Sequence, residues 1–177
     1  RPSPAHLTPR FAHASAHPAM SAIEPIPAAS LVRNLCAELQ RFAPFAQMAV
    51  TDVEAFVLLA RQTYYAPGEA LLQPADGPVS RLLYLRSGSV AGGAQGDDLA
   101  GSRFVLEPGE LFPAAAWLAR RAVSATYTAI DDCFCLEVPA AAMHELAQRS
   151  AVLADFLHGR VLHVLALSRQ AQKSTFA

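Results

Sequence analysis

Eight of the nine glycines lie between Gly68 and Gly109, where they interrupt short runs of leucine, valine, tyrosine and phenylalanine. Glycine adopts the positive φ angles that tight turns require, and prolines and aspartates beside several of these glycines are further turn formers. Short apolar runs separated by turns about every 8 to 12 residues are typical of a sandwich or jelly-roll barrel. The glycine-rich region is therefore predicted to be all-β, without alternating strands and helices.

The predicted strands lie on both sides of one helical interruption. Within residues 111–121, Pro113 at a first helical position is followed by three alanines and Trp117, a pattern that favours a helix of about two turns. Strands are expected at 69–73, 82–86, 88–94, 103–107, 123–130 and 133–138. We therefore predict a mainly β fold, a double-stranded β-helix or jelly roll, with flanking N- and C-terminal helices.

Helical periodicity appears on both sides of the glycine-rich region. Leucines behind a candidate N-cap at Ser30 predict a helix over 31–42, and a capping-box pattern at 51–54 predicts a second helix over 52–61. After Pro139 we expect helices at 141–148 and from about residue 152 onward. The last helix carries an apolar stripe on one side, made of Leu153, Leu157, Val161, Val164, Leu165 and Ser168.

These elements divide the chain into three segments. Residues 1–29 are predicted to be an irregular extension, because six of the 13 prolines fall before residue 28. Residues 30–150 form the β-roll domain. Residues 151–177 form a connector helix that leads to domains absent from this chain.

Composition excludes several classes of protein. The 14 lysines and arginines against 15 acidic residues give a formal net charge of −1, so no basic field attracts nucleic acid. No apolar run approaches the roughly 20 residues of a membrane-spanning helix. Three cysteines do not make a disulfide framework, which favours reduced thiols and a cytoplasmic location.

A metalloenzyme built on the same barrel is also excluded by the pattern of histidines. Cupins hold a metal with histidines on inward-facing strand positions, whereas all six histidines here lie outside the predicted β region, at 6, 13, 17, 144, 158 and 163. Cys133 and Cys135 alternate on a strand and are interpreted as small core residues. We predict no metal site, no cofactor and no catalytic residues.

The order of elements, together with three segments of sequence, resembles the cyclic-nucleotide-binding domain family. Residues 39–45 resemble the entry helix of that family, residues 65–72 its first hairpin, and residues 83–90 its central strand and turn. The resemblance covers about residues 35 to 170. It implies a β-roll that binds a cyclic nucleotide through the inserted helical element.

In that family the inserted element is the phosphate-binding cassette, which begins Phe-Gly-Glu and ends Arg-Ala-Ala-Thr or a similar sequence. The glutamate holds the ribose hydroxyl and the arginine holds the cyclic phosphate. Placing Phe112 on the first residue and Thr126 on the last puts Pro113 at the glycine, Ala114 at the glutamate and Val123 at the arginine. The resemblance therefore implies a cassette in which both ligand anchors are missing.

The candidate ligand-binding residues are those of this cassette: Phe112, Pro113, Ala114, Ala115, Arg120, Arg121, Val123, Ser124, Ala125 and Thr126. Backbone N–H groups at Ala114 and Ala115 begin a helix and can face an anion. Arg120 or Arg121 either supplies the missing cation or simply closes the short helix in solvent. The expected ligand is a cyclic nucleotide or another small anion, bound weakly.

The departures from the family pattern resemble a narrower group, the N-terminal sensors of bacterial signal-transduction proteins that also carry CBS domains and a nucleotidyltransferase-like domain. The segments that carry this likeness are 112–116, 123–127, 132–139, 155–162 and 165–169. The resemblance implies a non-catalytic regulatory sensor whose partners are those downstream domains. The apolar stripe over 152–170 separately predicts a homodimer.

Two other functions compete with this interpretation. One is a working cyclic AMP or cyclic GMP receptor that uses Arg120 or Arg121. The other is a truncated transcription regulator of the catabolite-activator type, which the sequence disfavours because no helix-turn-helix follows the β-roll before residue 177.

Overall fold

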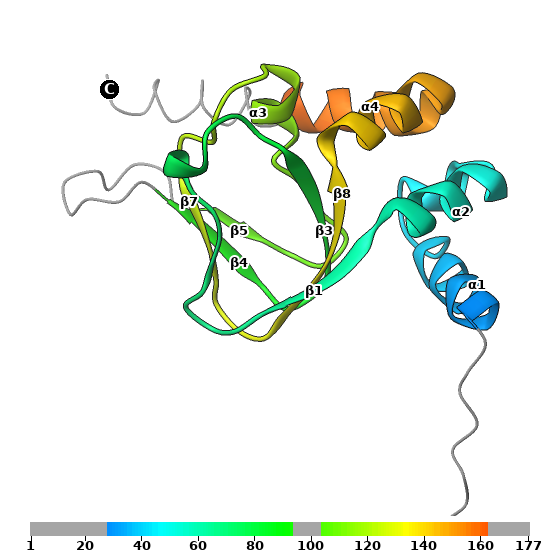
Figure 1. Cartoon of the computed structure of the whole chain (residues 1–177), viewed down its shortest axis with the longest axis horizontal. Helices are drawn as coiled ribbons and strands as arrows, with labels where there is room; N and C mark the ends of the chain where they lie inside the picture. Colours follow the sequence, from blue (N-terminus) through cyan, green and yellow to red (C-terminus); the bar gives the residue numbers. More distant parts are fainter. Residues whose placement is uncertain (1–27, 94–103, 163–177) are drawn as a thin grey trace, which may run out of the picture.

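Two four-stranded antiparallel sheets form a β-roll in the computed structural model, which describes residues 28–93 and 104–162 (Figure 1). The first sheet has the strand order β1-β8-β3-β6, and the second has the order β2-β7-β4-β5. The strands are β1 (Arg61–Tyr65), β2 (Ala70–Leu72), β3 (Arg81–Ser87), β4 (Val90–Gly93), β5 (Phe104–Leu106), β6 (Leu111–Phe112), β7 (Thr126–Ala129) and β8 (Cys133–Pro139). This architecture confirms the predicted jelly-roll type of fold.

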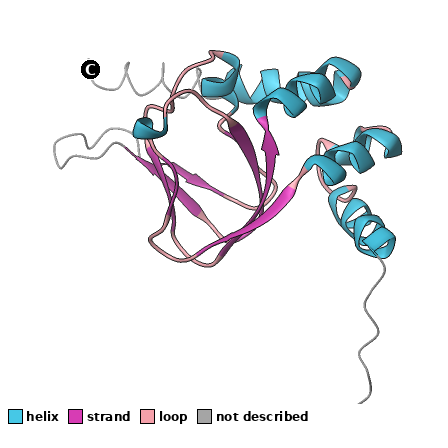
Figure 2. Cartoon of the chain, viewed as in Figure 1, coloured by secondary structure: helices cyan, strands magenta, loops and turns pink. Residues whose placement is uncertain are grey.

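Helices lie on the outer face of the first sheet, as Figure 2 shows for the cyan elements. They are α1 (Ala28–Leu39), α2 (Val50–Leu59), α4 (Ala140–Arg149) and the helix at residues 151–162, which we call the C-terminal helix. A fifth helix, α3 (Ala114–Leu118), interrupts the strands as predicted. More of the described residues lie in helices than in strands, so the expectation of a mainly β fold needs correction.

Alternation along β8 separates two apolar cores. Leu136 and Val138 point outward into a helix-side core that also holds Phe45, Phe56 and residues of α4. Cys133 and Cys135 point inward into a roll core between the two sheets, where they are 0% and 1% exposed. The prediction that these cysteines are core residues is confirmed. Burial raises the pKa of Cys135 to about 12, so its thiol stays protonated and serves packing.

Both predicted helix starts before the roll are wrong. Ser30 lies inside α1, which begins at Ala28, and α2 begins at Val50 with Ala49 as an N-cap that has no side-chain hydrogen bond. The helix predicted over 52–61 ends at Leu59, because the backbone from Arg61 onward pairs with β8 as strand β1. Packing and sheet pairing therefore outweigh the local capping signals.

The predicted strands are largely confirmed, with three corrections. β4 begins at Val90 because Gly88, with a φ of +90°, forms the preceding turn. β7 begins at Thr126 and not at residue 123, and the two-residue strand β6 was not predicted. The predicted helix at 141–148 corresponds to α4. Most of the extension predicted at 1–29, and the connector beyond residue 162, lie outside the described residues.

Candidate functional site

The segment equivalent to the predicted cassette runs from β6 through α3 to the start of β7. Pro113 is the N-cap of α3, which corrects the prediction that it occupies the first helical position. The helix ends where Arg120 adopts a left-handed backbone with a φ of 52°. The N–H of Arg121 then donates to Ala116 O at 3.1 Å and the N–H of Arg120 donates to Trp117 O at 3.0 Å. This pair of bonds is a Schellman motif, which caps the carboxyl end of the helix.

Buried apolar side chains hold this segment between the two cores. Ala114 and Trp117 belong to the helix-side core, whereas Phe112, Ala116 and Val123 belong to the roll core. Ala114 and Val123, the residues aligned with the glutamate and the arginine of the family motif, are each 6% exposed. Both positions are therefore filled by small side chains that carry no polar atom.

The two arginines of the segment point away from these cores. Arg120 and Arg121 are both exposed, and neither guanidinium makes a hydrogen bond or ion pair with a described residue. The carbonyl of Arg121 accepts from Val79 N at 3.2 Å, so the backbone of this residue is engaged while its side chain is not. Arg120 and Arg121 thus cap the carboxyl end of α3 through their backbone groups and not through their side chains. Whether either one binds an anion stays a prediction.

The remaining candidate residues occupy mixed surroundings. Phe112 is 4% exposed and its ring stacks on that of Tyr127, with centroids 5.4 Å apart and an interplanar angle of 11°. Pro113 is buried, Ala115, Ala125 and Thr126 are half-buried, and Ser124 is exposed. The structure therefore brings the predicted residues into one continuous segment, but it does not test their contact with a ligand.

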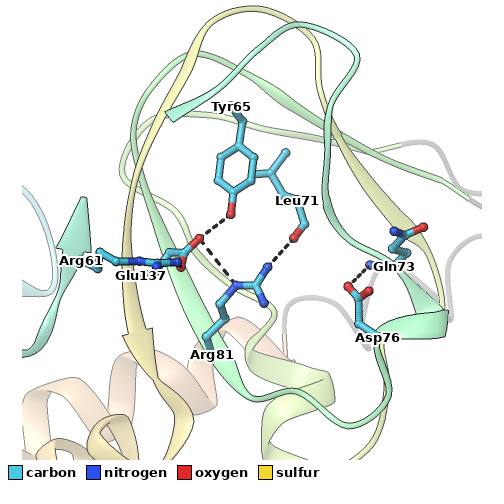
Figure 3. A network of polar contacts seen from close by, with 7 residues as sticks. All are labelled: Arg61, Tyr65, Leu71, Gln73, Asp76, Arg81 and Glu137. Atoms are coloured by element: carbon cyan, nitrogen blue, oxygen red, sulfur yellow. Dashed lines mark hydrogen bonds and ion pairs between the residues drawn. The ribbon is translucent and has the colours of Figure 1, made fainter. Parts of the chain in front are cut away.

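A group of polar side chains occupies one end of the first sheet and was not predicted as a site (Figure 3). Glu137 on β8 is 5% exposed, and it accepts hydrogen bonds from Tyr65 Oη and from Arg61 Nη2, the latter at 2.8 Å. Arg81 Nε lies 3.6 Å from Glu137 Oε1, and Arg81 Nη2 donates to Leu71 O at 3.0 Å. Arg81 thus joins β3 of the first sheet to β2 of the second.

The protonation of Glu137 and Tyr65 reflects this arrangement. Burial alone raises the pKa of Glu137, but the hydrogen bonds from Tyr65 and Arg61 and the charges of Arg81 and Arg61 outweigh it, so the pKa lies below its ordinary value. Burial and the bond to Glu137 raise the pKa of Tyr65. Glu137 is therefore a carboxylate and Tyr65 a neutral donor at neutral pH.

Sequence reasoning missed this group although one signal was present. Cys133, Cys135 and Glu137 are alternate residues of one strand and therefore face the same side of the sheet. Because the two cysteines were interpreted as core residues, this alternation places Glu137 toward the core as well. A carboxylate at an inward position needs cationic or hydrogen-bonding partners. The partners lie 56 to 76 residues away, so only the strand register identifies them.

The C-terminal helix packs beside the entrance to the cassette. Leu153 and Leu157 are 0% and 1% exposed in the helix-side core, and Arg160 Nη1 forms an ion pair with Glu110 Oε1 at 2.8 Å. Glu110 is two residues before Phe112. The first part of the apolar stripe thus packs within the chain, which removes that part from the predicted dimer contact. Residues 163–170 lie outside the described residues, and the dimer itself stays a prediction.

Two further findings concern membrane spans and metal sites among the described residues, 28–93 and 104–162. None of their helices combines the length and apolar character needed to cross a membrane. Within the same residues, no three histidine, cysteine, aspartate or glutamate side chains gather in a way that suits a metal ion.

Comparisons with known proteins identify a family model and related folds. Residues 62–150 match the model of the cyclic nucleotide-binding domain. The catabolite activator protein of Thermus thermophilus is 20% identical with a TM-score of 0.61, and the alignment covers 78% of this chain and 62% of that one. The sensor domain of the transcriptional regulator DNR from Pseudomonas aeruginosa is 16% identical, with a TM-score of 0.66 and coverage of 80% and 95%.

A third similar structure is the regulatory domain of Toxoplasma gondii PKA, crystallised with cAMP. It is 14% identical with a TM-score of 0.66, and the alignment covers 77% of this chain and 51% of that chain. No curated protein matches the sequence. At these identities the solved structures establish likeness of fold, and the chain spans about three fifths of the length of the catabolite activator protein.

Replacing Glu137 with glutamine tests the role of the polar group in stability. We expect Glu137→Gln to lower the free energy of unfolding at pH 7 by about 1 to 2 kcal/mol, because charged hydrogen bonds are lost and Arg61 is largely exposed. A carboxyl with a lowered pKa stabilises the fold above the ordinary value of 4.5 and loses that effect as the pH falls. The difference from wild type, measured by urea denaturation, should therefore shrink between about pH 5 and pH 3.

Glu38→Gln is the matched control for this experiment. Glu38 pairs with Arg86 at 2.7 Å but is 43% exposed, so its loss should cost under about 1 kcal/mol. Equal losses for the two variants, or a Glu137→Gln difference that does not change with pH, would contradict this account.

Proposed function

Because the chain belongs to the cyclic nucleotide-binding domain family, we propose that it is a non-catalytic regulatory sensor domain with a degenerate phosphate-binding cassette. The observation that carries the proposal is the pair of buried apolar residues, Ala114 and Val123, at the positions of the two ligand anchors. Neither side chain can donate to a phosphate or accept from a ribose hydroxyl. The cassette therefore keeps the shape of the family element but lacks its polar contacts.

The energies of hydrogen bonds give the expected loss of binding affinity when both anchors are missing. A hydrogen bond to a charged group contributes about 1.5 to 3 kcal/mol, so two missing anchors weaken binding by roughly 4 kcal/mol. That corresponds to about a thousandfold in affinity. A cyclic nucleotide that binds a complete cassette at micromolar concentration would bind this one in the millimolar range.

The alternative of a working receptor needs a cation from Arg120 or Arg121. Both side chains are exposed, and the Schellman motif fixes the backbone that carries them. Neither guanidinium makes a hydrogen bond or ion pair with a described residue. The geometry therefore favours the degenerate cassette over the receptor.

The proposed output runs through the C-terminal helix. This helix contacts the cassette entrance through the ion pair between Arg160 and Glu110, while Leu157 fixes it to the helix-side core. We propose that a change in the cassette that breaks this part-exposed ion pair lets the helix shift between two positions. We propose that its position passes to downstream CBS and nucleotidyltransferase-like domains, or to a second subunit, in a bacterial signal-transduction protein.

The similar structures leave a transcription regulator of the catabolite-activator type as the second candidate. The fold matches such a protein from Thermus thermophilus and the sensor domain of DNR over most of this chain. Our proposal of the CBS-linked context rests on the resemblance of the cassette residues and of segments in β8 and the last helix to that group. Extending the reading frame beyond Ala177 distinguishes the two, since one would encode CBS domains and the other a DNA-binding helix-turn-helix.

Restoring the anchors tests the degenerate cassette directly. Calorimetry with cyclic AMP and cyclic GMP should give millimolar or undetectable affinity for the wild-type chain. The double variant Ala114→Glu, Val123→Arg should bind at least about a hundredfold more tightly, because each restored bond contributes 1.5 kcal/mol or more. Circular dichroism checks that the double variant folds. If it does not fold, the affinity of the wild-type chain alone tests the proposal of a degenerate cassette.

The matched control places the same charges one residue away, as Ala115→Glu with Ser124→Arg. These positions are half-buried and exposed, and we expect no gain in affinity there. Micromolar binding by the wild-type chain that is abolished by Arg121→Ala would contradict the proposal and establish the receptor instead.

The link between the C-terminal helix and the cassette is tested by hydrogen exchange. Arg160→Ala or Glu110→Gln should speed amide exchange in residues 151–162 by up to about fivefold, since a part-exposed ion pair contributes under about 1 kcal/mol. Arg149→Ala, which breaks the 3.1 Å pair between α4 and Asp52 of α2, is the control and should leave this helix unchanged. The same exchange rates in all variants would show that the ion pair does not hold the helix.

A further inference from the structure

The polar group around Glu137 lies on the inner face of the roll, not on its outer surface. Leu82 and Tyr84 on β3 point into the helix-side core, so Arg81 and Leu83 point to the opposite face. On β8 the same alternation turns Glu137 inward beside Cys135. Figure 3 shows the guanidinium of Arg81 lying between β3 and the carbonyl of Leu71 on β2. Glu137 and Arg81 therefore lie at one end of the roll interior, and the largely exposed Arg61 lies beside them.

The charges of this group do not balance. Glu137 carries one negative charge, and it is paired with Arg61 at 2.8 Å and with Arg81 at 3.6 Å. Arg61 donates the shorter bond, and Tyr65 Oη donates to the other carboxylate oxygen. The carboxylate is therefore already satisfied by groups other than Arg81. One positive charge remains, and it lies on the more enclosed guanidinium, since Arg81 is 34% exposed and Arg61 is 77% exposed.

The donors of Arg81 are also incompletely used. Nη2 donates to Leu71 O, while Nε is buried and has no hydrogen bond. Nη1 has no acceptor among the described residues. Nε faces Glu137 at 3.6 Å, so Nη1 and the second N–H of Nη2 are the donors that remain for a further partner. An oxyanion is the partner that the planar donor edge of arginine fits best.

Arg81 also lies beside both ends of the cassette. Two residues before it, Val79 N donates to the carbonyl of Arg121, where the cassette helix has just closed. Two residues after it, Leu83 pairs with Phe112, where the cassette begins. The backbone on both sides of Arg81 thus contacts the cassette segment, while the guanidinium itself contacts Glu137 and Leu71 O.

We propose that Arg81 is the cationic anchor of an oxyanion site at this end of the roll, and that the site takes the phosphate group of a small ligand. The ion pair between Nε and Glu137 and the bond from Nη2 to Leu71 O hold the guanidinium in place, and Nη1 with the second N–H of Nη2 is the donor edge left for the ligand. Arg61 offsets the charge of Glu137, which reduces its repulsion of an anion. The proposal rests on the proposed function only in expecting a regulatory ligand, since the phosphate can belong to a cyclic nucleotide or to free inorganic phosphate.

Ligand-induced thermal shifts test the site with three probes: cyclic AMP, inorganic phosphate and uncharged adenosine, each at about 10 mM and equal ionic strength. For a dissociation constant near 1 mM, a bound anion should raise the melting temperature of the wild-type chain by about 3 °C or more. Adenosine, which lacks a phosphate, should give no shift. Each variant is compared with its own ligand-free melting temperature, so a change in stability alone does not affect the result.

Arg81→Gln should abolish the anion-induced shift, and Arg81→Lys should reduce it because a lysine keeps the charge but loses the planar pair of donors. Arg61→Gln is the matched control. It removes one positive charge from the same group, so a general field effect would weaken binding as much as Arg81→Gln does. The proposal predicts that the shift persists in Arg61→Gln.

The outcomes separate this site from the proposed function. A phosphate shift that depends on Arg81, with no extra effect of cyclic AMP, supports the site and identifies free phosphate as the source. A cyclic AMP shift unchanged in Arg81→Gln overturns the site and leaves nucleotide sensing through the cassette. If neither anion shifts the wild-type chain, or if Arg61→Gln and Arg81→Gln lose the shift equally, the site is overturned while the degenerate cassette is unaffected.

Discussion

The pairing of β8 with β1 on one side and β3 on the other supports the rest of the structure. Its register sets Glu137 opposite Arg61 and opposite Leu83, and its alternation sends Leu136 and Val138 to the helices while Cys135 faces the roll. A shift of one residue would exchange these two sets and bury charge in the helix-side core. The fold and the interior polar group therefore depend on the same register.

The cassette segment lies where the two cores meet. α3 contributes Trp117 to the helix-side core and Ala116 to the roll core, so a movement of this short helix would disturb both. Glu110 before it forms an ion pair with Arg160 of the C-terminal helix, and Arg121 after it accepts a hydrogen bond from Val79, two residues before β3. The segment from β6 to β7 is thus connected to both cores and to the C-terminal helix, through which it could influence the rest of a protein.

Local signals in the sequence predicted much of the roll, and long-range contacts explain what they missed. Glycine and proline turns located most strands, because turn geometry is set by the residues at the turn itself. The strand β1 was not predicted at all, because Arg61, Gln62 and Thr63 have no apolar alternation and form a strand through pairing with β8. The two N-caps failed because α1 and α2 are held by Leu39, Phe56 and the ion pair of Glu38 with Arg86, and not by their first turns.

The apolar stripe of the last helix shows the same limit, since periodicity reveals a buried face but not what covers it. The short helix between the strands was predicted from Pro113 and the alanines that follow it, whereas the proposed anchor at Arg81 required the register of β3 against β8. The most direct test of the central claim is an NMR titration of the isotopically labelled chain with cyclic AMP. We predict that no amide signal of residues 112–126 moves toward saturation at micromolar nucleotide. Saturating shifts of Ser124, Ala125 and Thr126 with a micromolar midpoint would contradict the account.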